Sequence, residues 1–191
     1  MRQSNRRAPQ RLLYVDDNAD DVLFFQEAAR RAGVPLQIDC VSGPASATDY
    51  LDDLAQIIDR QEYAKPALAL LDCHFPGAAG TNLIEWIRAH PQFSSLPIVV
   101  FTGSEAPDQV ARCYGSGADY FLVKPTGNIL SRLTLIVQAL HAYVASNPTS
   151  VELLVHLPEY RPDPTGHSSG SSGLRIRSGL TPWVQSRPPS P

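Results

Sequence analysis

Five short apolar runs alternate with segments of helical periodicity between residues 11 and 145, and this alternation restricts the fold more than any other feature. The runs are residues 12–15, 36–41, 67–71, 97–102 and 120–123. Apolar runs of this length are typical of strands that are buried on both faces. Strands that alternate with helices predict an α/β domain: a doubly wound, five-stranded parallel sheet with helices on both faces.

The intervening segments carry the start, stop and spacing signals of helices. Asn18 or Asp20 can cap the first helix, Gly33 can end it, and Pro44 can begin the second. The expected helices cover residues 19–32, 44 to about 60, 80–89, 106–115 and 128–144. Apolar side chains at helical spacing mark the inward faces of the second, third and fifth helices: Ala47, Leu51, Leu54 and Ile58; Leu83, Ile84 and Ile87; Ile129, Leu133, Ile136, Val137 and Leu140.

The composition changes near residue 146 and divides the chain into three parts. Pro, Gly and Ser fill 21 of the last 46 positions. Such a segment cannot bury enough apolar area to offset its ordering entropy. We therefore expect a disordered basic arm over residues 1–10, a folded domain over 11–145, and a mostly disordered Pro/Ser/Gly-rich tail over 146–191.

Composition also excludes several classes of protein. No window approaches 18 consecutive apolar residues, and no apolar segment follows the charged N-terminus, so we expect neither a membrane span nor a secretory signal. The formal net charge of −3 argues against a nucleic-acid binder. The three cysteines, Cys40, Cys73 and Cys113, form no C-x-x-C pair, which predicts small buried side chains without a disulfide or zinc site and fits a cytoplasmic protein.

Polar side chains stand where four of the five strands end: Asp16 and Asp17, Asp72, Thr102 and Lys124. In this fold class, ligands bind beyond the carboxyl ends of the strands. Three carboxylates in one pocket repel each other unless a cation is present, and Mg²⁺ prefers oxygen ligands. An ammonium and a hydroxyl suit phosphoryl oxygens, and a carboxylate can act as a nucleophile. The set therefore favours formation and hydrolysis of an aspartyl phosphate.

The motifs at these strand ends resemble those of response-regulator receiver domains of two-component signalling. They are VDDN at 15–18, LLDCHFP at 70–76 with Gly80, VVFTG at 99–103, GAD at 117–119 and FLVKP at 121–125. The resemblance covers about residues 11–144 and implies the flavodoxin-like receiver fold. The long segment 56–66 further resembles stand-alone receivers associated with phytochrome-type sensor kinases.

The resemblance implies a phosphoacceptor and a metal site. Asp72 would accept the phosphoryl group. Asp16, Asp17, Asp72 and the backbone carbonyl of His74 would hold Mg²⁺. We expect the His74 imidazole itself to point to solvent. Phe75 stands where the family usually has Met, which leaves the catalytic groups unchanged.

The resemblance also implies a switch. Thr102 would bind the phosphoryl oxygens and Lys124 would pair with the phosphate. Phe121 occupies the position of the aromatic switch residue. Pro125 would follow a cis Lys124–Pro125 bond, which X–Pro sequences can adopt.

Together these features predict a single-domain response regulator without enzymatic activity beyond its own phosphorylation and dephosphorylation. A partner histidine kinase would phosphorylate Asp72, and residues 106–115, 120–123 and 128–144 would then present a changed surface to a downstream protein or a second copy.

Three alternatives remain open on the sequence. One is a receiver that does not switch and binds a partner constitutively. Another is a phosphate-ester hydrolase with Asp72 as nucleophile, although His74 stands where such enzymes carry a second acid. The third is a flavin or nucleotide carrier, although an acidic loop replaces the phosphate-binding cradle.

Overall fold

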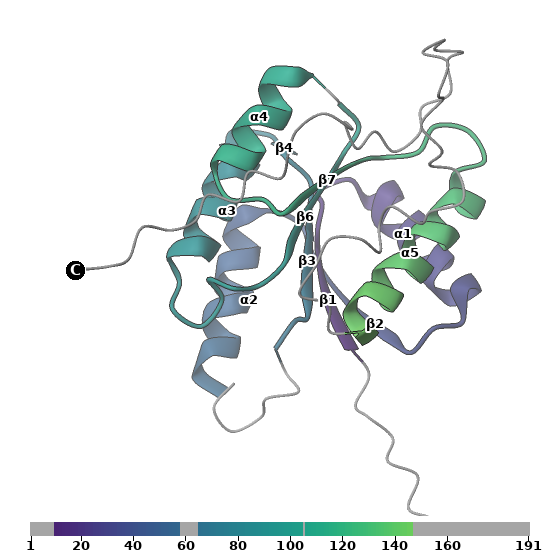
Figure 1. Ribbon diagram of the computed structural model, residues 1–191, viewed down its shortest axis with the longest axis horizontal. Helices are drawn as coiled ribbons and strands as arrows, with labels where there is room; N and C mark the ends of the chain where they lie inside the picture. The colour runs from purple at the N-terminus through teal and green to yellow at the C-terminus, as the bar shows by residue number, and fades with distance from the viewer. Residues whose placement is uncertain (1–9, 58–64, 105, 147–191) are drawn as a thin grey trace, which may run out of the picture.

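The computed structural model describes residues 10–57, 65–104 and 106–146, which form a parallel sheet between two layers of helices (Figure 1). The sheet has five strands in the order β2-β1-β3-β6-β7. They are β1 (Gln10–Val15), β2 (Leu36–Val41), β3 (Leu68–Leu71), β6 (Ile98–Thr102) and β7 (Tyr120–Val123). The predicted fold class is confirmed. Gln10, which we had assigned to the basic arm, belongs to β1 because it pairs with Leu36.

The helices lie on both faces of the sheet, as right-handed crossovers between parallel strands require. They are α1 (Ala19–Ala32), α2 (Pro44–Ile57), α3 (Gly80–Ala89), α4 (Pro107–Gly115) and α5 (Ile129–Ser146). Figure 1 shows α2, α3 and α4 on one face and α1 and α5 on the other. No helix in the described residues is long and apolar enough to cross a membrane.

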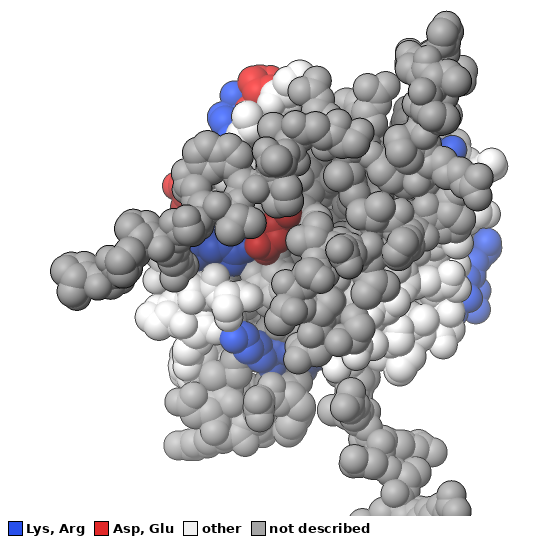
Figure 2. Space-filling view, viewed as in Figure 1, with Lys and Arg blue, Asp and Glu red and all other residues white. Residues whose placement is uncertain are grey.

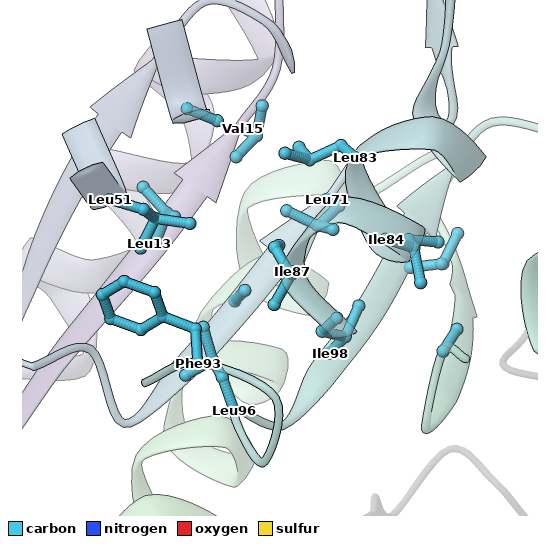
Figure 3. Packing of buried hydrophobic residues seen from close by; sticks show 14 of the residues in the cluster. Leu13, Val15, Leu51, Leu71, Leu83, Ile84, Ile87, Phe93, Leu96 and Ile98 are labelled. Atoms are coloured by element: carbon cyan, nitrogen blue, oxygen red, sulfur yellow. The ribbon is translucent and has the colours of Figure 1, made fainter. Parts of the chain in front are cut away.

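Alternate side chains of each strand supply two separate cores. On β1, Leu13 and Val15 face the α2–α3–α4 side, which Figure 3 shows from close by, while Leu12 and Tyr14 face α1 and α5. All four are fully buried. Residues from all five strands belong to both cores. The residues that directly follow β1 and β3, Asp16 and Asp72, lie at the carboxyl edge of the sheet instead.

The ends of α1 follow the predicted signals. The Asn18 side chain accepts hydrogen bonds from the backbone N–H groups of Asp20 and Asp21, at 3.0 and 3.4 Å. Gly33 adopts a φ of 63°, which glycine tolerates, and its N–H donates to the carbonyl of Ala29. The capping choice left open between Asn18 and Asp20 is settled in favour of Asn18.

Two local expectations were incomplete or wrong. Strands β4 (His74–Phe75) and β5 (Ala78–Ala79) form an antiparallel pair that the sequence pattern did not predict, because two residues are too few to show an alternation. Ile129, expected on the inward face of α5, is 38% exposed. As the first residue of the helix, it has no preceding turn over which its side chain can pack.

The remaining expectations concern residues outside the described ranges. These are the arm over residues 1–9, the tail over 147–191, and Ile58 within the long segment 56–66. On the face that Figure 2 shows, acidic and basic side chains of the described residues are interspersed.

Candidate functional site

The ends of β1, β3 and β7 bring two carboxylates and an ammonium group together. Lys124 Nζ lies 2.7 Å from Asp16 Oδ2 and 2.7 Å from Asp72 Oδ2. The parallel register explains this meeting, because Val15 pairs with Leu71 and each aspartate is the next residue along. Both aspartates are buried, at 2% and 7% exposure. The predicted convergence of Asp16, Asp72 and Lys124 is therefore present.

A third carboxylate joins this group from the first turn of α1. Asp21 Oδ2 lies 2.8 Å from Lys124 Nζ. Sequence reasoning missed this residue. The Asn18 cap orients that turn toward the site, but acidic residues are common in first turns for reasons of capping and dipole alone, so the signal was not specific.

Three carboxylates thus surround one ammonium, so the cluster carries an excess of negative charge. Burial would lower the pKa of Lys124, but hydrogen bonds to Asp16, Asp21 and Asp72 outweigh burial and raise it. Lys124 therefore stays charged. Asp16 is further held by the Tyr14 hydroxyl at 2.5 Å and the Asn18 N–H at 3.0 Å. Burial, followed by the hydrogen bond to Asp16, raises the pKa of Tyr14, which keeps this phenol a donor.

The donor groups suit a hard cation by their chemistry. Asp16, Asp17 and Asp72 offer only oxygen, which Mg²⁺ prefers, and the cluster lacks positive charge. Asp17 is exposed beside the cluster. In the described part of the chain, no three His, Cys, Asp or Glu side chains are placed to ligate one ion. Lys124 lies among the carboxylates instead, so a cation would have to share or displace its contacts.

Thr102 lies at the end of β6, fully buried, and its hydroxyl contacts His74 rather than solvent. Its Oγ1 is 2.8 Å from His74 Nδ1. The same nitrogen lies 3.3 Å from Gln109 Nε2. The backbone N–H of His74 donates to Asp72 Oδ1 at 3.0 Å. The expectation that this imidazole points to solvent was wrong for Nδ1. The β4–β5 pair turns His74 back over the site, although 58% of its side chain remains exposed.

The two other predicted switch features have different outcomes. Phe121 is buried at 7% exposure, in the core that α3 and α4 cover, and its role in switching stays a prediction. The expected cis Lys124–Pro125 bond was wrong: the described residues contain no cis peptide bond. The trans form is the more stable one even before proline, and Lys124 reaches all three carboxylates from it.

Gly80 lets the start of α3 approach the predicted phosphoacceptor. A Cβ atom at this position would lie 2.8 Å from the carbonyl oxygen of Asp72 and 2.7 Å from Cys73 Cα. Real Cβ atoms do not make contacts this close with backbone atoms. The glycine eight residues after Asp72 is thus explained by close packing of two backbones.

A cavity of about 530 Å³ opens beside the cluster, between the start of α3 and α4. Asp17, His74 and Gln109 line it, and so do Cys73 and Cys113. The sulfur atoms of these two cysteines lie 3.0 Å apart. Their separation of 40 residues in sequence gave no sign of this contact.

The arrangement thus offers a buried carboxylate, a fixed ammonium and a hydroxyl at one edge of a sheet. A carboxylate can attack phosphorus, and the ammonium and hydroxyl can stabilise phosphoryl oxygens. The excess negative charge favours a divalent cation, which would have to share or displace the contacts of Lys124. Acidic groups surround this edge, so the site suits transient transfer of a phosphoryl group better than lasting binding of a polyphosphate.

Comparisons with known proteins agree with this geometry. A family model described as "Response regulator receiver domain" matches residues 13–138. The chain is 24% identical over 135 residues to the response regulator Rcp1 of Synechocystis sp. (strain ATCC 27184 / PCC 6803 / Kazusa), which covers 71% of this chain and 88% of Rcp1. The chain is also 28% identical to the two-component response regulator ARR6 of Arabidopsis thaliana, and it covers 62% of ARR6, which is less than two thirds of that protein.

Among solved structures, the phosphorylated cyanobacterial phytochrome response regulator RcpA is similar to this chain, and the similarity covers nearly the whole of RcpA. The identity is 29% and the TM-score 0.60, with 74% of this chain and 98% of RcpA covered. This similarity confirms the predicted resemblance to receivers of the phytochrome-associated type.

Proposed function

The chain belongs to the response regulator receiver domain family of two-component signalling, and on that premise we propose that Asp72 accepts a phosphoryl group from a partner histidine kinase in a Mg²⁺-dependent reaction. The single observation that carries this proposal is the buried Asp72 carboxylate held 2.7 Å from Lys124 Nζ. Burial of a carboxylate without a partner would only destabilise the fold. A carboxylate that is paired with a fixed cation can act as the nucleophile in phosphoryl transfer, because the cation stabilises the phosphoryl oxygens.

The transfer forms a bond between a carboxylate oxygen of Asp72 and phosphorus, and breaks the bond from phosphorus to the donor's nitrogen or oxygen. When Asp72 is phosphorylated, Lys124 moves its hydrogen bond from the carboxylate to a phosphoryl oxygen. Asp16, Asp17, Asp72 and the carbonyl of His74 would hold Mg²⁺, which supplies charge neutralisation when bound.

The switch that follows begins at Thr102. Its hydroxyl is now 2.8 Å from His74 Nδ1, so the phosphoryl oxygens must compete with the imidazole for this group. Movement of Thr102 toward the phosphate leaves space beside β6 that Phe121 can enter. The surface of α4, β7 and α5 then changes and binds a downstream protein or a second copy of the chain.

Two observations support this proposal beyond the charge cluster. The buried Thr102 hydroxyl lies 2.8 Å from His74 Nδ1, and this nitrogen lies 3.8 Å from Asp72 Oδ1, so the His74 imidazole connects the hydroxyl to the proposed phosphoacceptor. RcpA, which shares 29% identity over most of the chain, is a response regulator whose crystal structure is of the phosphorylated form.

The test is phosphorylation of the full chain by acetyl phosphate with and without Mg²⁺. We expect intact mass to show one added phosphoryl group with Mg²⁺, none without it, and none in Asp72→Asn. Elution volume on a sizing column reports any assembly that follows. Binding of Mg²⁺ without phosphorylation of Asp72 would contradict the proposal and favour the alternative, a receiver that binds its partner constitutively.

A further inference from the structure

Two thiols meet beside the phosphoacceptor in an arrangement that aspartyl phosphate chemistry does not require. Cys73 directly follows Asp72, and Cys113 lies in the last turns of α4. Their sulfur atoms are 3.0 Å apart. Because a disulfide bond is about 2.05 Å long, an approach of about 1 Å would join them.

The pair is accessible from one side. Cys113 is fully buried, whereas Cys73 is partly exposed, and both line the 530 Å³ cavity that also contains His74. A molecule as small as a hydroperoxide can therefore reach the sulfur of Cys73 through this cavity. Cys113 has no exposed surface, and its sulfur is in contact with the sulfur of Cys73.

We propose that Cys73 and Cys113 are a redox modification site, which a hydroperoxide converts into a reversible intramolecular disulfide. In the first step, the Cys73 sulfur attacks one oxygen of hydrogen peroxide and gives up its proton. The O–O bond breaks, the peroxide is reduced, and Cys73 becomes a sulfenic acid while hydroxide leaves and takes up a proton as water.

In the second step, the Cys113 sulfur attacks the sulfenic sulfur of Cys73. The S–O bond breaks, the S–S bond forms, and the oxygen leaves as a second water with the Cys113 proton. The two thiols lose two electrons and two protons in total, and one peroxide becomes two waters. A dithiol reductant restores the two thiols by exchange.

The backbone around Cys73 shows which element the bond would restrain. The position of a Gly80 Cβ atom lies only 2.7 Å from Cys73 Cα, so the start of α3 is packed directly against this residue. The start of α3 therefore restricts movement of the Cys73 backbone. A disulfide bond would connect α4 to the segment that carries Asp72. This consequence for signalling rests on the proposed function, since α4 belongs to the proposed switch surface; formation of the disulfide does not.

The chain contains its own control in Cys40. It lies on β2, and its sulfur accepts from Gln26 Nε2 at 3.4 Å. Cys40 packs with the α1–α5 core, whereas Cys73 and Cys113 belong to the opposite core, so the sheet separates them. Cys40 is therefore not expected to bond with either cysteine.

The experiment treats the reduced, unphosphorylated full chain with hydrogen peroxide and then blocks remaining thiols with an alkylating reagent. We expect the three alkylatable thiols to fall to one in the wild type, with the loss reversed by dithiothreitol. A tryptic digest separates the three cysteines, because Arg60, Arg88 and Arg112 lie between them, and should yield one crosslinked peptide joining Cys73 to Cys113.

Variants give the matched comparison. Cys40→Ser should still lose both of its thiols, while Cys73→Ser should form no intramolecular disulfide. Three alkylated thiols in oxidised wild type, a crosslink that involves Cys40, or a disulfide only between chains would each overturn the inference. The digest of the wild type decides the matter even if a cysteine variant fails to fold.

Phosphorylation by acetyl phosphate is measured on the reduced and the oxidised chain in parallel. Failure of the reduced chain to accept a phosphoryl group contradicts the proposed function and leaves the disulfide result standing. Absence of the disulfide in a chain that accepts the phosphoryl group contradicts only the redox site.

Discussion

Two cations, Lys124 and Arg88, organise opposite ends of the same sheet in different ways. Lys124, beyond the carboxyl end of β7, contacts three carboxylates. Arg88, near the end of α3, contacts one carboxylate and three carbonyl groups at the amino ends of β6 and β7. These are Asp119 Oδ2 at 2.8 Å, Gly117 O at 2.8 Å, Leu96 O at 2.7 Å and Ser94 O at 3.2 Å.

The difference lies in charge balance. The Arg88 network pairs one positive with one negative charge, and three neutral carbonyls accept further hydrogen bonds from the planar guanidinium. Asp119 Oδ2 in turn accepts the Ile98 N–H at 2.7 Å, so the network also fixes the start of β6. The Lys124 cluster leaves negative charge uncompensated. The Arg88 network is balanced in charge and stabilises the fold. The Lys124 cluster keeps an excess of negative charge, which a divalent cation could neutralise during phosphoryl transfer.

Lys124→Met gives the largest expected effect and tests whether the carboxylates repel. Three close carboxylates without their cation should lower the free energy of unfolding by about 3–5 kcal/mol. Because a divalent cation can replace the lost charge, millimolar Mg²⁺ should restore part of this loss. Urea unfolding with and without Mg²⁺ measures both effects. Equal unfolding curves in the two conditions would contradict the charge argument.

Arg88→Met is the matched variant at the other end of the sheet. It removes the donor from two partly buried bonds, to the carbonyls of Gly117 and Leu96, so we expect a loss of about 2–3 kcal/mol. Mg²⁺ should not restore it, since only one carboxylate, Asp119, loses its partner there, and that side chain is 45% exposed to water. Arg88→Lys should recover only part of the loss, because an ammonium cannot reproduce the fork of a guanidinium. Rescue by Mg²⁺ here would remove the distinction between the two ends.

Gly80→Ala tests how tightly the carboxyl end is built. The added methyl meets the backbone of Asp72 and Cys73, which cannot rotate away, so we expect a loss of about 1–3 kcal/mol and slower phosphorylation of Asp72. Gly115→Ala is the control: a Cβ atom there meets nothing within 4 Å, and alanine favours the helix. Thermal unfolding of both variants makes the comparison, and an unchanged Gly80→Ala melting temperature would contradict the close approach.

The smallest effects have opposite signs and are the sharpest test. Asp72→Asn removes one of three mutually repelling charges and should stabilise the Mg²⁺-free protein by about 1 kcal/mol while abolishing phosphorylation. Asp119→Asn removes the carboxylate that pairs with Arg88 and should destabilise the protein by about 1 kcal/mol. Denaturant titrations of the two variants side by side check the signs. Destabilisation by both variants would mean that the Lys124 cluster carries no excess of negative charge.

Much of the fold could be predicted because its signals are local. The runs that became the five strands, the Asn18 cap and the Gly33 stop each depend on a few neighbouring residues. The strand-end rule then placed Asp16, Asp72 and Lys124 together, since parallel strands end at one edge. Two expectations failed for local reasons, the trans bond before Pro125 and the exposed Ile129 at the first position of its helix. The expectation for the His74 imidazole failed because a distant residue, Thr102, contacts its Nδ1.

The sequence by itself determined the order of strands and helices along the chain and the polar groups that end four of the five strands, because periodicity and side-chain type are properties of short segments. Tertiary structure decided which distant groups meet. Asp21 and Lys124 are 103 residues apart, and the sulfurs of Cys73 and Cys113 are 40 apart. Such contacts depend on how α1 and α4 pack against the sheet, and that packing is the sum of many weak apolar contacts that no single motif records.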